Sequence, residues 1–169
     1  DENPMVPALG DNVIDTSRGT TIDLNGVRVG TIEHVMAAIA GLQIDNLLIE
    51  IDAPEAPIMD GSSIEIFESL QAAGTTIQNA DKKFYEIKER IEFSIPEKGI
   101  DIVAFPDDHF SLTVQVDYNS KVLGNQYASL NKIEDFGKEI APCRTFVFLH
   151  EIEALAKQNL IKGGDLDNA

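Results

Sequence analysis

Cysteine, histidine and basic residues are scarce in this chain of 169 residues. The single cysteine, Cys143, excludes an internal disulfide framework and indicates a reducing compartment, so we expect a cytoplasmic protein. Lysine and arginine total 13 against 29 acidic side chains, which gives a net charge of −16. Such a field repels polyanions, so nucleic acid is not an expected partner. No apolar run approaches the roughly 18 residues of a membrane span, so no transmembrane segment is expected.

What is present is an ordinary globular composition, 43% hydrophobic and 25% charged, with two kinds of periodicity. Apolar residues alternate in some segments, as in strands, and recur at three- and four-residue spacing in others, as in helices. The run at 46–51 is nearly continuous and predicts a buried strand. The other strands are predicted at 12–15, 20–24, 27–29, 84–95, 100–105 and 110–118, the last three as an antiparallel meander, and the helices at 31–41, 63–74, 133–140 and 146–159.

Particular residues predict where these elements begin, turn and end. The dipeptide Asn25-Gly26 predicts a tight hairpin, Thr31 is a plausible N-cap, and Gly41 is a plausible helix stop. Strands precede helices twice along the chain, which favours two α+β layers over a doubly wound parallel sheet. The polar, turn-like segment 79–82 separates them, so we expect a first domain at residues 1–80 and a second at 81–169.

The pair Glu33-His34 stands at the start of the first predicted helix. An imidazole can hold a metal ion while an adjacent carboxylate takes a proton from the water bound to that ion. The helix macrodipole alone also favours a glutamate in the first turn, so an ordinary helix start is the competing interpretation. The metalloprotease pattern H-E-x-x-H is not present, because Ala37 and Ala38 stand where the second histidine is needed.

Longer motifs surround this pair. They are T-I-E-H-V-M-A-A-I-A-G at 31–41, I-D-N at 44–46, A-P-I-M-D-G-S at 56–62, C-R-T-F at 143–146 and L-I-K-G-G at 160–164. In order and spacing they closely resemble the UDP-3-O-acyl-N-acetylglucosamine deacetylase family, which performs the committed step of lipid A synthesis in Gram-negative bacteria. The resemblance runs from about residue 3 to residue 169, so we expect an incomplete chain without the family's first strands and its later zinc motif.

The resemblance implies roles for particular residues. Glu33 matches the family's general base, His34 its first zinc ligand, and Thr145 the residue whose hydroxyl supports the tetrahedral oxyanion. One zinc ion is implied as cofactor, and an acylated UDP-amino sugar as substrate. The segment 147–166 resembles the insert that forms the acyl-chain passage. The residues implied in substrate binding are Phe146, Gly164, Asp117, Tyr118, Leu149, Ile152, Leu155, Ile161 and Leu166.

The sequence departs from the family in its metal ligands. The second zinc motif, H-K-x-x-D-x-x-G-D, and the later histidine that acts as general acid are absent from residues 1–169. His109 stands in a P-D-D-H turn and His150 in the predicted insert helix, and solvated side chains are expected at both. Catalytic zinc takes three protein ligands, so we expect this chain alone to bind zinc weakly and not to catalyse.

The implied fold is two similar two-layer α/β sandwich domains, with the active site between them and the second domain truncated. The implied activity of the parent protein is zinc-dependent removal of acetate from the 2-acetamido group of UDP-3-O-acyl-N-acetylglucosamine. Some family members continue into a fused acyl-carrier-protein dehydratase. Two alternatives stay open. One is a non-catalytic sugar-nucleotide or acyl-binding module without metal, and the other is an acidic α+β domain that acts through protein contacts.

Overall fold

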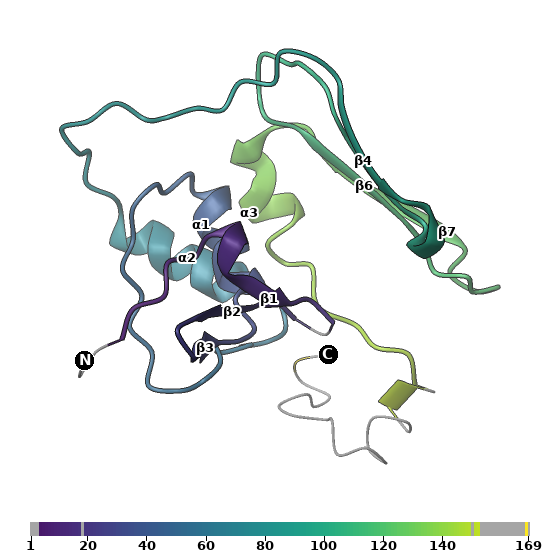
Figure 1. The fold of residues 1–169 in the computed structure, drawn as a ribbon, viewed down its shortest axis with the longest axis horizontal. Helices are drawn as coiled ribbons and strands as arrows, with labels where there is room; N and C mark the ends of the chain where they lie inside the picture. Colours follow the sequence, from purple (N-terminus) through teal and green to yellow (C-terminus); the bar gives the residue numbers. More distant parts are fainter. Residues whose placement is uncertain (1–3, 18, 150, 153–167, 169) are drawn as a thin grey trace. The chain divides into compact units, whose positions relative to one another are not determined.

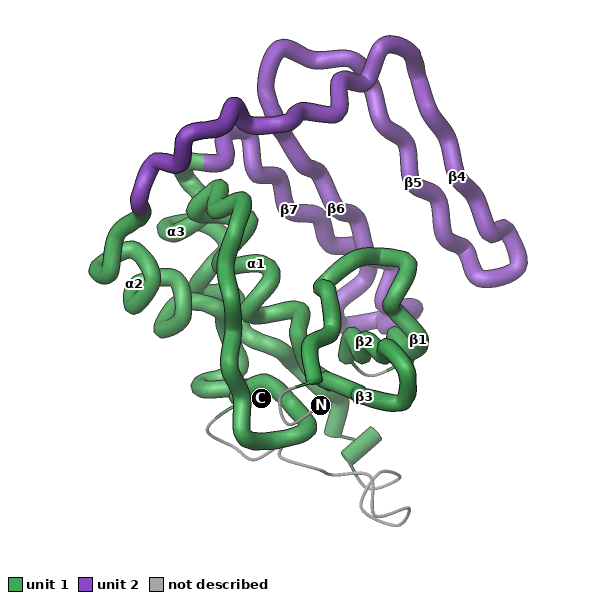
Figure 2. The backbone as a smooth tube through the Cα atoms, turned by 60° about the vertical axis from the view of Figure 1, so that its left-hand side comes forward, with its two compact units in different colours: residues 1–75, 134–169 green, residues 76–133 purple. Residues whose placement is uncertain are grey.

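The computed structural model describes residues 4–17, 19–149, 151–152 and 168. Short helices are mixed with antiparallel sheets, which confirms the α+β class (Figure 1). The chain forms two compact units, one of residues 1–75 with 134–169 and one of residues 76–133 (Figure 2). Residues 134–169 thus cluster with the first unit, and the division into domains at residue 80 stays a prediction. In the described part, no helix has both the length and the apolar character needed to cross a membrane.

Among the residues that the structure describes, the elements of the first unit include a three-stranded antiparallel sheet and the three α-helices named below. The predicted hairpin is confirmed, because Asn25 and Gly26 both adopt positive φ angles, of 55° and 86°, as a two-residue turn requires. The elements of the first unit are η1 (Gly10–Asn12), β1 (Val13–Asp15), β2 (Thr21–Leu24), β3 (Val27–Val29), α1 (Glu33–Gly41), α2 (Ile64–Ala73), η3 (Ile133–Asp135, at the junction of the units) and α3 (Phe136–Glu139).

Two phenylalanine rings and two glycines join the three helices. Phe67 of α2 and Phe136 of α3 are both buried, and their ring centroids lie 5.7 Å apart. Gly41 ends α1 as predicted, and the Phe136 ring occupies the space that a side chain at Gly41 would need. A Cβ atom on Gly137 would lie 2.5 Å from the Phe67 ring. Both glycines are therefore required for this close packing.

The prediction of a buried strand at 46–51 is wrong. These residues belong to no strand of the described chain, and the exposed fractions of Leu47, Leu48, Ile49 and Ile51 run from 39% to 69%. An apolar run forms a strand only where a neighbouring strand supplies its hydrogen-bond partners, so local preference alone does not decide the outcome.

The second unit consists of two separate hairpins. Strands β4 (Ile91–Ile95) and β5 (Ile100–Ala104) pair across the short helix η2 (Pro96–Lys98), and β6 (Leu112–Asp117) pairs in register with β7 (Asn125–Leu130). The predicted meander is therefore wrong in its pairing, because β6 joins β7 instead of β5. Pro106, which has no N–H group for a strand ladder, lies two residues after the end of β5 at Ala104.

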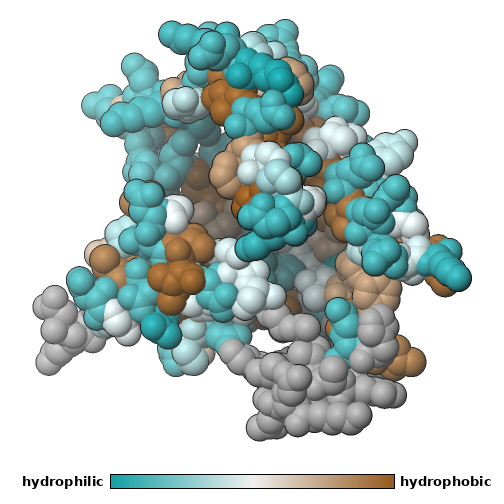
Figure 3. Space-filling view, turned by 45° about the vertical axis from the view of Figure 1, so that its right-hand side comes forward, coloured by the Kyte–Doolittle hydropathy of each residue, from teal (hydrophilic) through white to brown (hydrophobic). Residues whose placement is uncertain are grey.

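Apolar side chains of these hairpins remain exposed (Figure 3). Phe93 and Ile102 pair across β4 and β5, and their exposed fractions are 56% and 60%. Leu112, Val114 and Val116 show the predicted alternation along β6 and are exposed as well. A two-stranded hairpin gains little stability by itself, so neither hairpin forms a closed core.

Candidate active site

Glu33 and His34 lie together at the start of α1. Glu33 is the first residue of the helix, and its Oε1 atom is 3.9 Å from Nε2 of His34. The His34 side chain is only 11% exposed, whereas that of Glu33 is 37% exposed. The structure thus places the predicted base beside the predicted metal ligand, with the Glu33 side chain partly exposed. This arrangement allows the carboxylate to exchange a proton with a group held near the imidazole.

The backbone before β2 orients the Glu33 carboxylate. The Thr20 N–H donates a hydrogen bond of 2.8 Å to Glu33 Oε2. A Cβ atom on Gly19 would lie 3.2 Å from Oε1, so a glycine allows this backbone to approach so closely. Sequence reasoning missed both residues. The only signal available was a glycine directly before a predicted strand, which marks a close approach of backbone without naming the partner.

The expectation that Thr31 caps α1 is wrong. Ile32 occupies the N-cap position, and no side chain there bonds the first turn. Thr31 has a φ angle of +56°, whereas a capping residue needs an extended backbone. Its hydroxyl instead donates a hydrogen bond of 3.0 Å to Oε2 of Glu55.

Thr145 is held through its backbone against the turn of residues 58–62. Its N–H donates a bond of 2.7 Å to the Gly61 carbonyl oxygen, and the preceding Arg144 donates from Nε to the Asp60 carbonyl oxygen at 2.6 Å. Thr145 itself is exposed. Phe146 follows it, 54% exposed and packed edge to face on Phe148.

The turn that supports Thr145 is internally bonded. The Asp60 carboxylate accepts hydrogen bonds from the Ser62 hydroxyl at 2.7 Å and from the Ser62 N–H at 3.0 Å. These bonds, together with the nearby Arg144 charge, hold the pKa of the Asp60 carboxyl below its ordinary value. Ser62 is buried, and the Asn168 carbonyl lies against Gly61 where a side chain would stand. Residues 59–61 therefore form a turn.

The remaining substrate-binding predictions are not tested by the structure. Asp117 ends β6 in the second unit and Tyr118 follows it. The Asp117 carboxylate accepts a bond from the N–H of Asn119, and the Tyr118 N–H donates to the Gly124 carbonyl oxygen. Leu149 is exposed and Ile152 is half-buried, both with helical backbone. Outside the described residues lie His150, Leu155, Ile161, Gly164, Leu166 and most of the predicted helix at 146–159.

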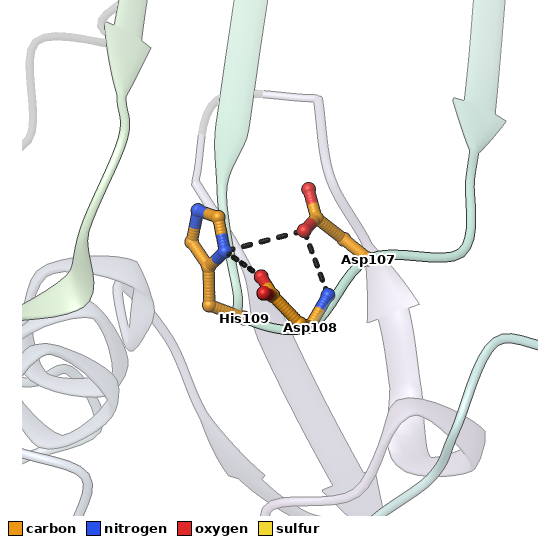
Figure 4. Close-up of side chains that lie close together, drawn as sticks. All are labelled: Asp107, Asp108 and His109. Atoms are coloured by element: carbon orange, nitrogen blue, oxygen red, sulfur yellow. Dashed lines mark hydrogen bonds and ion pairs between the residues drawn. The ribbon is translucent and has the colours of Figure 1, made fainter.

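Among the described residues, only one group brings three potential metal ligands together. It is Asp107, Asp108 and His109, shown in Figure 4. One ring nitrogen of His109, Nδ1, faces both carboxylates, at 2.5 Å from Asp108 and 3.2 Å from Asp107. The hydrogen bond to Asp108 and the Asp107 charge raise the pKa of His109 above its ordinary value. The His109 side chain is about half exposed in this surface turn, so the solvated histidine predicted there is confirmed.

The described residues do not complete a catalytic zinc site around His34. The only cluster of three ligand-type side chains in the described ranges is the one at 107–109, and it excludes His34. Catalytic zinc takes three protein ligands and an open position. His34 and Glu33 therefore suit one ligand and a neighbouring base, but no more of the site is present in this part of the chain.

Comparisons with known proteins cover the whole chain. The LpxC family, described as UDP-3-O-acyl N-acetylglycosamine deacetylase, matches residues 1–169. The chain is 52% identical over 167 residues to a Chlorobaculum tepidum protein named bifunctional enzyme LpxC/FabZ, covering 98% of this chain and 36% of that protein. It is 41% identical over 165 residues to the UDP-3-O-acyl-N-acetylglucosamine deacetylase of Myxococcus xanthus, covering 97% of this chain and 52% of that protein. The chain thus spans only part of the length of these relatives.

Proposed function

The chain belongs to the UDP-3-O-acyl N-acetylglycosamine deacetylase family, and from that premise we propose that it carries half of a deacetylase active site. The reaction is removal of acetate from the 2-acetamido group of UDP-3-O-acyl-N-acetylglucosamine, in lipid A biosynthesis. Glu33 is the general base, His34 the first zinc ligand and Thr145 the oxyanion donor. The observation that carries the proposal is the 3.9 Å approach of Glu33 Oε1 to His34 Nε2 at the start of α1.

The chemistry assigned to this chain is proton transfer and charge stabilisation. The Thr20 N–H fixes one oxygen of Glu33, which leaves the other oxygen to accept a proton from the attacking water. The Thr145 hydroxyl can donate to the oxygen that becomes negative as the acetamide carbonyl is attacked. His34 supplies one of the three ligands that catalytic zinc takes, so the ion is proposed as cofactor of the protein at its natural length.

The finer architecture belongs to the same proposal. Two α/β sandwich domains, divided near residue 80, would carry the site between them in the natural-length protein. Phe146 and Gly164 would line it, Asp117 and Tyr118 would contact the UDP portion, and the residues of 147–166 would contact the acyl chain. The relatives named LpxC/FabZ support a fused second enzyme, which we take to be the acyl-carrier-protein dehydratase. A single cysteine supports a cytoplasmic location.

The role of Glu33 is tested by Glu33→Ala in the natural-length protein. Loss of a positioned general base should lower the rate of acetate release by about 10²–10⁴-fold, while the zinc content stays unchanged because Glu33 is not a ligand. Glu65→Ala is the matched control, since Glu65 is also an exposed acid in the first turn of a helix. Its activity should equal that of the unaltered protein. Full activity of Glu33→Ala would remove Glu33 from the mechanism.

The incomplete metal site is tested on the 169-residue chain by metal analysis after dialysis. With one of three ligands present, the chain should retain well under one zinc ion per molecule. A full equivalent of zinc that disappears in His34→Ala would show that this chain completes its own site. Sugar-nucleotide binding without acetate release by the natural-length protein would favour the non-catalytic binding module instead.

A further inference from the structure

Thr31, two residues before the start of α1, adopts a backbone conformation that its side chain disfavours. Thr31 has a φ angle of +56°, in the left-handed region that β-branched residues rarely adopt. Strained backbone of this kind persists only where the surroundings fix it, and it concentrates at functional sites. Thr31 stands two positions before Glu33, the proposed base. The contacts that maintain the backbone conformation of Thr31 therefore also determine the position of Glu33.

One set of these contacts comes from the segment 54–56. The Thr31 hydroxyl donates to Glu55 Oε2 at 3.0 Å. On either side of Glu55, the backbone pairs with Gly30: Gly30 N–H donates to the Pro54 carbonyl oxygen at 2.9 Å, and Ala56 N–H donates to the Gly30 carbonyl oxygen at 3.0 Å. A Cβ atom on Gly30 would lie 3.2 Å from Cγ of Glu55, so the glycine admits the stem of that side chain.

The second set comes from Thr20, before β2. Its carbonyl oxygen accepts a bond of 3.2 Å from the Ile32 N–H, and its own N–H donates to Glu33 Oε2 at 2.8 Å. The segment 30–32, which precedes α1, is therefore hydrogen-bonded both to residues 54–56 and to Thr20. Rotation of Thr31 toward an ordinary φ angle would move Ile32 and Glu33 relative to Thr20, so the two sets of contacts depend on each other.

We propose that Thr31 and Glu55 form a positioning pair, which holds the Glu33 carboxylate at the Thr20 amide and thereby in place for proton transfer. The part played by Glu33 in catalysis rests on the proposed function, whereas the coupling of the pair to the Glu33–Thr20 bond does not. Both members act through Glu33 and are positioning residues in that sense.

The first test measures hydrogen exchange at the Thr20 amide by NMR in the 169-residue chain. Thr31→Val keeps the branched shape but removes the hydroxyl, and Glu55→Ala removes the acceptor. Both should speed Thr20 exchange by about 10-fold or more, toward the rate in Glu33→Ala, which defines the unbonded limit. Thr31→Ser and Glu55→Gln keep a hydroxyl and an acceptor, so their exchange should stay within about threefold of the unaltered chain.

The second test measures deacetylation kinetics in the natural-length protein. A displaced base should lower kcat by roughly 10–100-fold in Thr31→Val and Glu55→Ala, with KM nearly constant and with activity retained in Thr31→Ser and Glu55→Gln. Unchanged Thr20 exchange in Thr31→Val and Glu55→Ala would overturn the proposal. Equal loss of protection in all four variants would also overturn it, because two of them retain the bond.

Two further outcomes separate the proposals. If the unaltered natural-length protein releases no acetate, the proposed function fails, whereas Thr20 exchange still decides whether the pair positions Glu33. If Thr31→Val loses cooperative unfolding, Glu55→Ala decides the same question, because it leaves residue 31 unaltered.

Discussion

At the scale of single residues, backbone amides help to orient two carboxylates of the first unit. Glu33 accepts from the Thr20 N–H, and Asp60 accepts from the Ser62 N–H. A backbone donor is fixed by the fold and carries no side-chain entropy, so it holds a carboxylate with less freedom than a lysine would. These two carboxylates are therefore positioned by the path of the chain, which makes them sensitive to changes in backbone conformation at neighbouring residues.

His109 gives a pH-dependent prediction at this scale. Its bond to Asp108 raises the pKa of the imidazole above 6.5 and lowers that of the Asp108 carboxyl below 3.8. The stabilisation of the folded chain by protonated His109 is fully present below pH 6.5 and is lost as the pH rises through the raised pKa of His109. The stabilisation by ionised Asp108 is present above pH 3.8 and is lost as the pH falls through the lowered pKa of Asp108. An NMR titration of the histidine rings from about pH 5 to pH 9 should show a His109 midpoint above 6.5.

Asp108→Asn is the control for this titration. It should move the His109 midpoint down, because it removes the carboxylate charge that accepts the His109 hydrogen bond. A midpoint at or below 6.5 in the unaltered chain would contradict the ion pair seen in Figure 4.

The candidate site divides into residues that the sequence reveals and residues that it does not. Adjacency along the chain is enough to pair Glu33 with His34, and a motif is enough to single out Thr145. The contacts of Gly19, Thr20 and Glu55 join segments distant in sequence, and several of them use backbone atoms common to every residue type. No pattern of side chains encodes such contacts, so they emerge only from the folded chain.

At the scale of elements, the helices of the first unit depend on glycines that face aromatic rings. Gly137→Ala should lower the free energy of unfolding by about 1–3 kcal/mol through overpacking against Phe67, offset by up to roughly 1 kcal/mol of helix propensity. Urea denaturation followed by circular dichroism measures the difference. Gly10→Ala is the matched control, because a Cβ atom there meets nothing within 4 Å, and its effect should stay within about 0.5 kcal/mol. Equal stability of the two variants would show that the Phe67 ring moves freely aside.

Elements with local signals are the ones that the sequence predicts well. The helix at 64–73 begins after Ser63 and ends before Gly74, and the turn at Asn25 needs only its own two residues. Strand pairing depends instead on distant partners. The run at 46–51 has no partner strand in the described residues, and β7 was missed because its polar residues obscure the alternation. Segment 84–90 likewise forms no strand, so β4 begins only at Ile91.

At the scale of the whole molecule, the net charge of −16 opposes compactness through self-repulsion. Raising the salt concentration from about 0.01 M to about 0.1 M shortens the screening length from about 30 Å to about 10 Å. The melting temperature at pH 7 should therefore rise, by about 2–4 °C for each 1 kcal/mol of repulsion removed. Circular dichroism melts measure this effect. Nearer the isoelectric point of about 4.3 the same change in salt should have little effect on the melting temperature. A melting temperature that falls with added salt at pH 7 would contradict destabilisation by self-repulsion.

The turn at Gly61 has a consequence for how the family can vary. The Gly61 carbonyl oxygen accepts a hydrogen bond from the Thr145 N–H, and the Asn168 carbonyl lies against the same glycine, so residues 145 and 168 meet at one point of the first unit. A segment closed at a single anchor changes length at small thermodynamic cost, about 0.6 kcal/mol for each doubling. We therefore expect insertions and deletions between residues 145 and 168 to change the free energy of unfolding of the first unit only slightly.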